Sequence, residues 1–175
     1  MKIIMVMVSS VNGKITNQNN PNIYSWTSKE DSEHFFSLIN DNNLIVMGRK
    51  TFESAGDKIK LLPDKLRIVL THSPDKYNEK EVTGQLEFSN EKVKKLVSKL
   101  KGLGYKKMLI VGGAQINKLF LQAGLVNEIY LTLEPKLFGK GKELLEPFNL
   151  QQNLRLVSYD KLNHQGTLLL HYKLV

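Results

Sequence analysis

The chain has 175 residues and a formal net charge of +8 at pH 7, so it is long enough for one domain with a buried core and favours anionic partners. The absence of Cys excludes disulfides, thiolate nucleophiles and cysteine-ligated zinc, and four scattered His lack a paired metal-binding spacing, so we expect no metal site. The apolar run at 3–8 is too short to span a membrane and lacks a signal-peptide cleavage site, which predicts a cytoplasmic protein without a membrane partner.

Hydrophobic patterning predicts an α/β fold in a single domain over 1–175. Strands that alternate with helices favour an open, mostly parallel sheet, and a polar loop is expected at 9–26. The last two strands have no helix between them, so we expect an antiparallel C-terminal hairpin that turns at 163–166. The predicted strands lie at 1–8, 44–47, 67–71, 86–88, 107–111, 128–133, 154–161 and 167–174.

Four helices are expected between these strands. Asn90 is the predicted N-cap of a lysine-rich helix that ends at Gly102 or Gly104, and Gly124 is the predicted C′ residue of the last helix. The other predicted helices lie at 28–42, 49–55 and 114–123.

The lysine-rich helix contains much of the excess positive charge. Val93, Leu96, Val97 and Leu100 recur at helical spacing and predict one buried stripe, which leaves the lysines of 92–101 on a solvated face. No aromatic residues interleave with these lysines as a single-strand binding surface requires. We therefore expect no nucleic-acid partner.

Two glycine turns follow apolar strands and open helices. At the first turn, Gly48 is followed by Arg49, Lys50 and Thr51, and the second contains Gly112 and Gly113. Glycine lets the backbone approach a ligand closely, and a helix N-terminus with adjacent cations favours phosphate. Two such turns at the carboxyl ends of strands in one small chain indicate a long ligand with several phosphates, such as a dinucleotide.

The order and spacing of several motifs resemble the dihydrofolate reductase-like superfamily. Segment 47–54, the Trp26…Asp31 pattern and segment 110–113 resemble dihydrofolate reductases. Other segments are more similar to the riboflavin-biosynthesis pyrimidine reductase, the C-terminal domain of the bifunctional deaminase-reductase. These segments are 9–15, 26–28, 124–129 and 135–141. The chain lacks the C-x-x-C signature of the zinc deaminase half, so the resemblance extends only to the reductase half.

The resemblance implies a mixed, mostly parallel sheet of about eight strands flanked by helices, with NADPH as the cofactor and a homodimer as the assembly. It places the cofactor phosphates and ribose at Arg49, Lys50 and Thr51, and the adenosine 2′-phosphate at the turn of 71–73. The complete set of implied cofactor residues is Gly48, Arg49, Lys50, Thr51, Thr71, His72, Ser73, Gly112, Gly113, Ala114 and Gln115.

Asp31 matches the acidic residue that binds the pterin ring in dihydrofolate reductases, where it supports protonation of the ring before hydride transfer. The same residue completes an S-x-x-D capping box with Ser28, in which case it only satisfies a backbone N–H. Trp26 is either a core anchor or a wall of the substrate pocket. The implied substrate residues are Met7, Asn12, Lys14, Trp26, Asp31 and Phe35.

The favoured function is NADPH-dependent reduction of 5-amino-6-(5-phosphoribosylamino)uracil, or of a related pyrimidine or pteridine. The substrate phosphate of that reaction needs cations, for which Lys14, Lys140 and Lys142 are candidates. Asn12 stands where the riboflavin branch usually has Asp, which puts that position's role in doubt. Dihydrofolate reduction is the first alternative, and a non-catalytic dinucleotide-binding module is the second.

Overall fold

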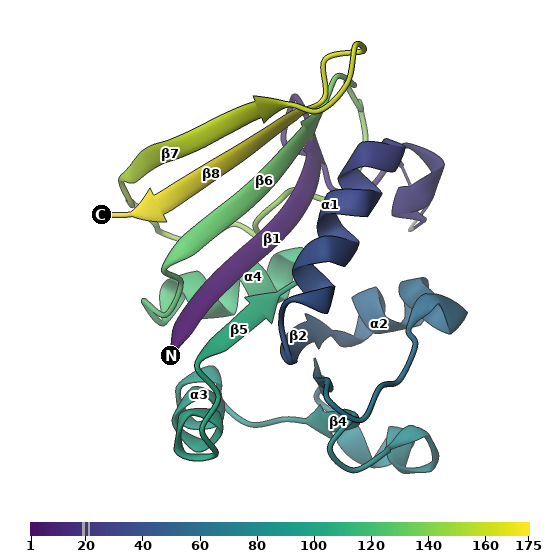
Figure 1. Ribbon diagram of the computed structural model, residues 1–175, viewed down its shortest axis with the longest axis vertical. Helices are drawn as coiled ribbons and strands as arrows, with labels where there is room; N and C mark the ends of the chain where they lie inside the picture. The colour runs from purple at the N-terminus through teal and green to yellow at the C-terminus, as the bar shows by residue number, and fades with distance from the viewer. Residues whose placement is uncertain (19, 21) are drawn as a thin grey trace.

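The strands of the computed structural model, which describes residues 1–18, 20 and 22–175, form one eight-stranded sheet in the order β4-β3-β2-β5-β1-β6-β8-β7 (Figure 1). Neighbouring strands from β4 to β6 are parallel, whereas β8 is antiparallel to both β6 and β7. This arrangement confirms the predicted α/β fold and its antiparallel hairpin. The strands are β1 (Lys2–Ser10), β2 (Leu44–Gly48), β3 (Leu66–Leu70), β4 (Leu86–Ser89), β5 (Lys107–Ile110), β6 (Glu128–Glu134), β7 (Leu154–Lys161) and β8 (Leu168–Leu174).

The helices lie close to their predicted positions, with one correction. Asn90 is not the N-cap of the lysine-rich helix, because that helix begins three residues later, at the buried Val93, and Lys92 is its N-cap. The N–H of Glu91 donates a hydrogen bond to the Ser89 hydroxyl at 3.1 Å, which forms a turn before the helix. The helices are α1 (Lys29–Asn40), α2 (Arg49–Ala55), α3 (Val93–Gly102) and α4 (Ala114–Gln122), with 3-10 turns η1 (Ile23–Ser25), η2 (Gly56–Lys58) and η3 (Pro74–Lys80).

The predicted loop at 9–26 differs from the structure at both ends. Strand β1 continues to Ser10, and η1 precedes Trp26. Residues 19 and 21 of this loop lie outside the described residues. The predicted C′ glycine of α4 is confirmed, because Gly124 has a φ of 66° immediately after the C-cap Ala123.

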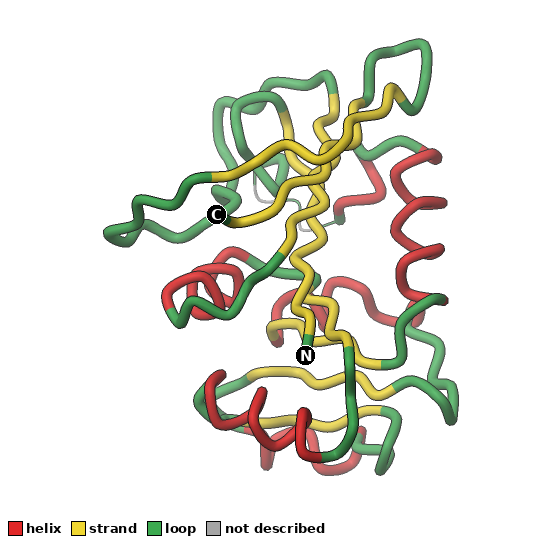
Figure 2. Tube along the Cα trace, turned by 60° about the vertical axis from the view of Figure 1, so that its left-hand side comes forward, coloured by secondary structure: helices red, strands yellow, loops and turns green. Residues whose placement is uncertain are grey.

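Each face of the sheet is covered by a different pair of helices, and Figure 2 shows helices on both sides of the strands. Alternate residues of β1 point to opposite faces. Ile3 belongs to the cluster that includes residues of α3 and α4, and Ile4 belongs to the cluster against which residues of α1 and α2 pack. Burial of Val93, Leu96 and Leu100 confirms the predicted stripe of α3. No helix in the described part of the chain is long and apolar enough to cross a membrane.

Parallel pairing aligns the carboxyl ends of β3, β2, β5 and β1 along one edge of the sheet. Both glycine turns follow directly from this edge, as does the Thr71–His72 turn. The N-terminal end of α1 lies near the carboxyl end of β1, on the face of the sheet that α2 also covers (Figure 1). The fold therefore places the sequence motifs at the edge where α/β proteins bind ligands.

Candidate active site

A cavity of about 660 Å³ lies at the carboxyl edge of the parallel strands. This volume falls within the range of small-molecule sites. Its lining comes from the first turns of α2 and α4 at one end and from α1 and β6 at the other. It brings together Met7, Asp31, Phe35, Gly48, Arg49, Lys50, Thr51, Thr71, His72, Gly113, Ala114 and Gln115, which are most of the sequence-predicted site residues.

The two glycine turns are in direct contact. The N–H of Gly48 donates a hydrogen bond to the carbonyl of Gly112 at 2.8 Å, and the Gly112–Gly113 peptide bond is cis. A Cβ on Gly48 would lie 2.9 Å from Cγ1 of Ile116, and one on Gly112 would lie 3.0 Å from Sδ of Met7. Gly112 also has a φ of 83°, which side chains rarely adopt. Packing against Ile116 therefore favours glycine at position 48, and the positive φ together with the Met7 side chain favours glycine at position 112.

Gly48 and Gly113 are the N-cap residues of α2 and α4, and neither has a side chain that could cap its helix. Ala114 and Gln115 form the first turn of α4 and line the cavity. The N-terminal N–H groups and the dipole of α4 favour an anion at this end of the cavity. The residues present therefore fit a phosphate-bearing ligand.

Arg49 lines the cavity but is engaged by its own helix. Its Nη1 lies 2.9 and 2.7 Å from the two carboxylate oxygens of Glu53, and the hydroxyl of Tyr77 donates to Glu53 at 2.6 Å. The hydrogen bonds from Tyr77 and Arg49 lower the pKa of Glu53. A ligand phosphate that uses Arg49 must compete with this carboxylate.

The turn after β3 is only partly in the cavity wall. Thr71 and His72 line the cavity. The N–H of Ser73 donates to the Thr71 hydroxyl at 3.3 Å, so Ser73 closes the turn. Two of the three residues predicted to contact a 2′-phosphate therefore face the cavity.

Asp31 lies at the other end of the cavity and is 7% exposed. The pKa of Asp31 is raised from 3.8 to about 6, chiefly by burial. A hydrogen bond with the Thr132 side chain lowers it, and the charge of Glu134 makes a smaller contribution that raises it. Burial and, to a smaller extent, the negative charge of Asp31 raise the pKa of the cavity-lining Tyr24. Asp31 can therefore hold a proton near neutral pH.

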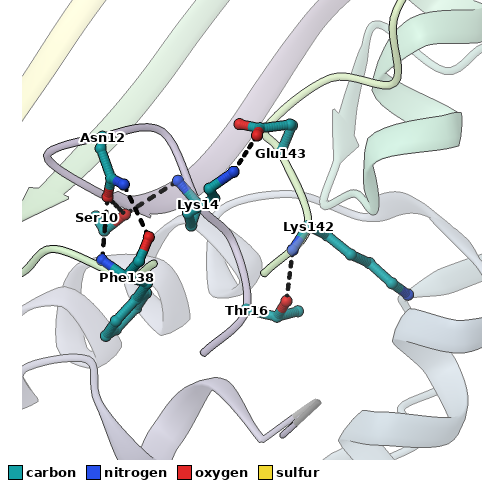
Figure 3. Close-up of polar contacts among 7 residues, drawn as sticks. All are labelled: Ser10, Asn12, Lys14, Thr16, Phe138, Lys142 and Glu143. Atoms are coloured by element: carbon teal, nitrogen blue, oxygen red, sulfur yellow. Dashed lines mark hydrogen bonds and ion pairs between the residues drawn. The ribbon is translucent and has the colours of Figure 1, made fainter. Parts of the chain in front are cut away.

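Three of the predicted substrate residues, Asn12, Lys14 and Trp26, contact other parts of the chain. Asn12 and Lys14 lie at the junction where segment 10–16 meets segment 138–143 (Figure 3). Asn12 Nδ2 donates to the carbonyl of Phe138 at 2.8 Å, and the N–H of Phe138 donates back to Asn12 Oδ1 at 3.2 Å. Lys14 pairs with Glu143. Trp26 is buried and packs edge-on against Phe138, with ring centroids 5.1 Å apart, which is the core-anchor position.

The same junction places one cation in the cavity wall. The N–H of Lys142 donates to the Thr16 hydroxyl at 2.8 Å, and both residues line the cavity. A Cβ on Gly141 would lie 2.0 Å from the Thr16 carbonyl oxygen, so this contact needs glycine. Of the two lysines Lys14 and Lys142, the second is the one that can meet a ligand.

Sequence reasoning missed several residues of the Asp31 end. Tyr24, His34, Tyr130 and Thr132 line the cavity there. His34 was detectable, because it lies three residues after Asp31 and therefore on the same helix face. Thr132 was not, because only the parallel pairing of β1 and β6 brings it beside α1.

The family model described as RibD C-terminal domain matches residues 1–168. The uncharacterized protein YyaP of Bacillus subtilis (strain 168) is 29% identical over 165 residues, which cover 90% of this chain and 87% of YyaP. A pyrimidine reductase-like protein of Corynebacterium diphtheriae matches with a TM-score of 0.83 at 16% identity over 99% of this chain and 92% of its own. An Enterococcus faecalis dihydrofolate reductase complexed with NADP(H) matches with a TM-score of 0.70 at 21% identity over 99% and 96%. The last two likenesses show the fold.

Proposed function

We propose, because the chain belongs to the RibD C-terminal domain family, that it is an NADPH-dependent reductase of the riboflavin-biosynthesis type. The proposed substrate is 5-amino-6-(5-phosphoribosylamino)uracil or a related pyrimidine or pteridine. The observation that carries this proposal is a single cavity with an anion-binding backbone at one end and the buried Asp31 carboxyl at the other. We propose that residues 1–175 act as one reductase domain.

NADPH supplies the hydride when it is bound, and the chain supplies orientation and a proton. Gly48, Gly112 and Gly113 would receive the pyrophosphate, because Gly48 and Gly113 open α2 and α4 and the N-terminal N–H groups of α4 favour an anion. Arg49 and Lys50 would meet phosphate oxygens, and Thr71 and His72 would face the adenosine end. All of these residues except Gly112 line the cavity, and the Enterococcus dihydrofolate reductase of the same fold is complexed with NADP(H).

Asp31 is the proposed catalytic residue. Hydride addition to a C=N bond leaves an electron pair on nitrogen, which must take a proton. A carboxyl with a pKa of about 6 can deliver that proton from its oxygen and be reprotonated from solvent. The apolar walls formed by Met7 and Phe35 would hold a planar heterocycle beside it.

Lys142 is the proposed partner of a substrate phosphate. It lines the cavity, whereas Lys14 is paired with Glu143. Lys142→Gln should raise the KM for the phosphorylated pyrimidine and leave the KM for NADPH unchanged. An unchanged pyrimidine KM would remove Lys142 from the substrate site.

Dihydrofolate is the second candidate substrate, and the buried Asp31 favours it. NADPH oxidation should be followed with the phosphoribosylamino-pyrimidine and with dihydrofolate in parallel. Turnover of the pyrimidine supports the first proposal, and turnover of dihydrofolate alone moves the assignment to the folate reaction. NADPH binding without turnover of either substrate would contradict both proposals and leave a dinucleotide-binding module.

We also propose a homodimer in which β7 is covered by a second copy of the chain. Every residue of β7 is exposed, including the apolar Leu156 and Tyr159, at 48% and 69%. An apolar edge strand of this kind favours pairing with another chain. Sedimentation should give a dimer for the wild type and a monomer for Leu156→Glu/Tyr159→Glu.

A further inference from the structure

The capping box at the start of α1 is only half formed by Asp31. The hydroxyl of Ser28 accepts a hydrogen bond from the N–H of Asp31 at 3.2 Å, as the S-x-x-D pattern predicts. The reciprocal bond comes from another element, because the N–H of Ser28 donates to Oε1 of Glu134 at 2.6 Å. A carboxylate at the end of β6 therefore takes the position that the Asp31 carboxylate would occupy in a complete box.

Glu134 is fixed from its other side as well. It is 2% exposed, and its Oε2 accepts a hydrogen bond from the hydroxyl of Thr167 at 2.8 Å. Asn163 donates to that hydroxyl at 2.9 Å and to Glu30 of α1 at 3.1 Å. This network ties the turn of the β7–β8 hairpin to the first turn of α1 through Glu134.

The network contains a charge without a cationic partner. Among the described residues, Glu134 forms no ion pair with Lys, Arg or His, in contrast to Glu128 on the same strand, which pairs with Lys2 at 2.7 Å. A buried carboxylate that is not neutralised disfavours ionisation of a second carboxyl beside it. The charge of Glu134 raises the pKa of Asp31 in this way.

We propose that Glu134 is a positioning residue for Asp31. By accepting the capping hydrogen bond it leaves the Asp31 carboxyl free to face the cavity, and by its charge it favours the protonated form of that carboxyl. A role in turnover rests on the proposed reductase function, whereas the effect on Asp31 does not.

The other groups that face Asp31 stay constant in the test. They are Tyr24 of η1, His34 one turn along α1, and the uncharged Thr132 of β6. The ammonium of Lys58 lies over the Tyr24 ring, 3.1 Å from its centroid. Glu134→Gln removes one charge from this set and keeps an oxygen acceptor for the Ser28 N–H.

The Asp31 carboxyl should be titrated by 13C NMR in the full chain, with Asp31→Asn to assign its resonance. Glu134→Gln should lower the Asp31 pKa by a smaller part of its rise from 3.8 to about 6, because burial, the larger cause, remains. Glu128→Gln is the matched control, because it makes the same change at a carboxylate of β6 that is 5% exposed. It should leave the Asp31 pKa unchanged.

Thr167→Val keeps the Glu134 charge and removes one hydrogen bond, so the Asp31 pKa should stay raised even if the fold is less stable. With a reducible substrate, kcat should decline with rising pH, and in Glu134→Gln this decline should occur at lower pH. The difference in pH should equal the decrease in the Asp31 pKa that NMR measures. The KM for NADPH should not change.

An Asp31 pKa that is equal in folded Glu134→Gln and in the wild type would overturn the proposal. If the wild type reduces neither heterocycle, the reductase function fails while the titration still decides the role of Glu134.

Discussion

The two ends of the cavity are built from different parts of the chain. The glycine end is made largely of backbone, and Gly48 and Gly112 are joined by a main-chain hydrogen bond. Cβ atoms at these two positions would lie 2.9 Å from Ile116 and 3.0 Å from Met7. The Asp31 end is made of side chains from α1 and β6, and its chemistry depends on burial and on the neighbouring Glu134. The glycine end, which we propose binds the cofactor, tolerates little change in shape, whereas the proposed role of the Asp31 end depends on charge.

The largest expected effect is on turnover at the Asp31 end. Asp31→Asn keeps the shape of the carboxyl but cannot release a proton, so kcat should fall about 100-fold or more with whichever heterocycle is reduced. NADPH affinity should stay within about twofold, because the glycine end is unchanged. The control is Asp41→Asn at the exposed C-cap of the same helix, which should keep full activity. Full turnover by Asp31→Asn would show that Asp31 supplies no proton, and the Asp31 end would then only bind the substrate.

The same substitution should change stability in a pH-dependent way. The pKa of Asp31 is raised from 3.8 to about 6, so its contribution to stability is fully present below about pH 4 and is lost as pH rises through 6. Relative to the wild type, Asp31→Asn should therefore gain about 2 kcal/mol in the free energy of unfolding between pH 4 and pH 8. Urea unfolding at both pH values measures this difference. An equal gain in Asp41→Asn would assign it to the helix as a whole.

At the glycine end the expected effect is smaller and steric. Gly112→Ala would place a Cβ 3.0 Å from Sδ of Met7 at a φ of 83°, which costs about 1–2 kcal/mol of stability and should weaken NADPH binding about tenfold. Gly104→Ala is the matched control, because its φ of 93° carries the same backbone cost but its Cβ would meet nothing within 4 Å. Both variants should melt at lower temperature, and only Gly112→Ala should bind NADPH less tightly. Equal NADPH affinities would contradict the role of Gly112 in the cofactor site.

Most of the fold was predictable because hydrophobic spacing is a local signal. The buried stripe of α3 and the continuous apolar run of β2 each identify their element from a few neighbouring residues. The start of α3 was not predictable from the capping preference of Asn90, because the helix begins where Val93 is first buried. Tertiary packing here overrides a local preference.

The candidate site likewise has a part that local sequence predicts and a part that only tertiary packing creates. The sequence predicts both glycine turns at the carboxyl ends of parallel strands. Their contact depends on β2 and β5 being neighbours in the sheet, which the strand order of the structure shows. The role of Asp31 stayed open, because the residue that replaces it in the capping box lies 106 positions away from Ser28. Nothing near Asp31 in the sequence indicates that a second carboxylate will be buried beside it.

The smallest expected effect tests whether the Arg49–Glu53 pair competes with the cofactor. The two side chains are 40% and 41% exposed, and such surface pairs contribute about 0–1 kcal/mol. Glu53→Gln keeps an acceptor for the Tyr77 hydroxyl and frees Arg49, so NADPH affinity should rise up to about fivefold. The gain should shrink at high salt and should be smaller for NADH, which has one phosphate fewer. The control is Glu33→Gln, which breaks a similar exposed pair with Lys29 on α1 and should leave both affinities unchanged. If Glu53→Gln binds NADPH no better at low salt, Arg49 does not meet a cofactor phosphate, and the anion-binding capacity of this end belongs to the backbone alone.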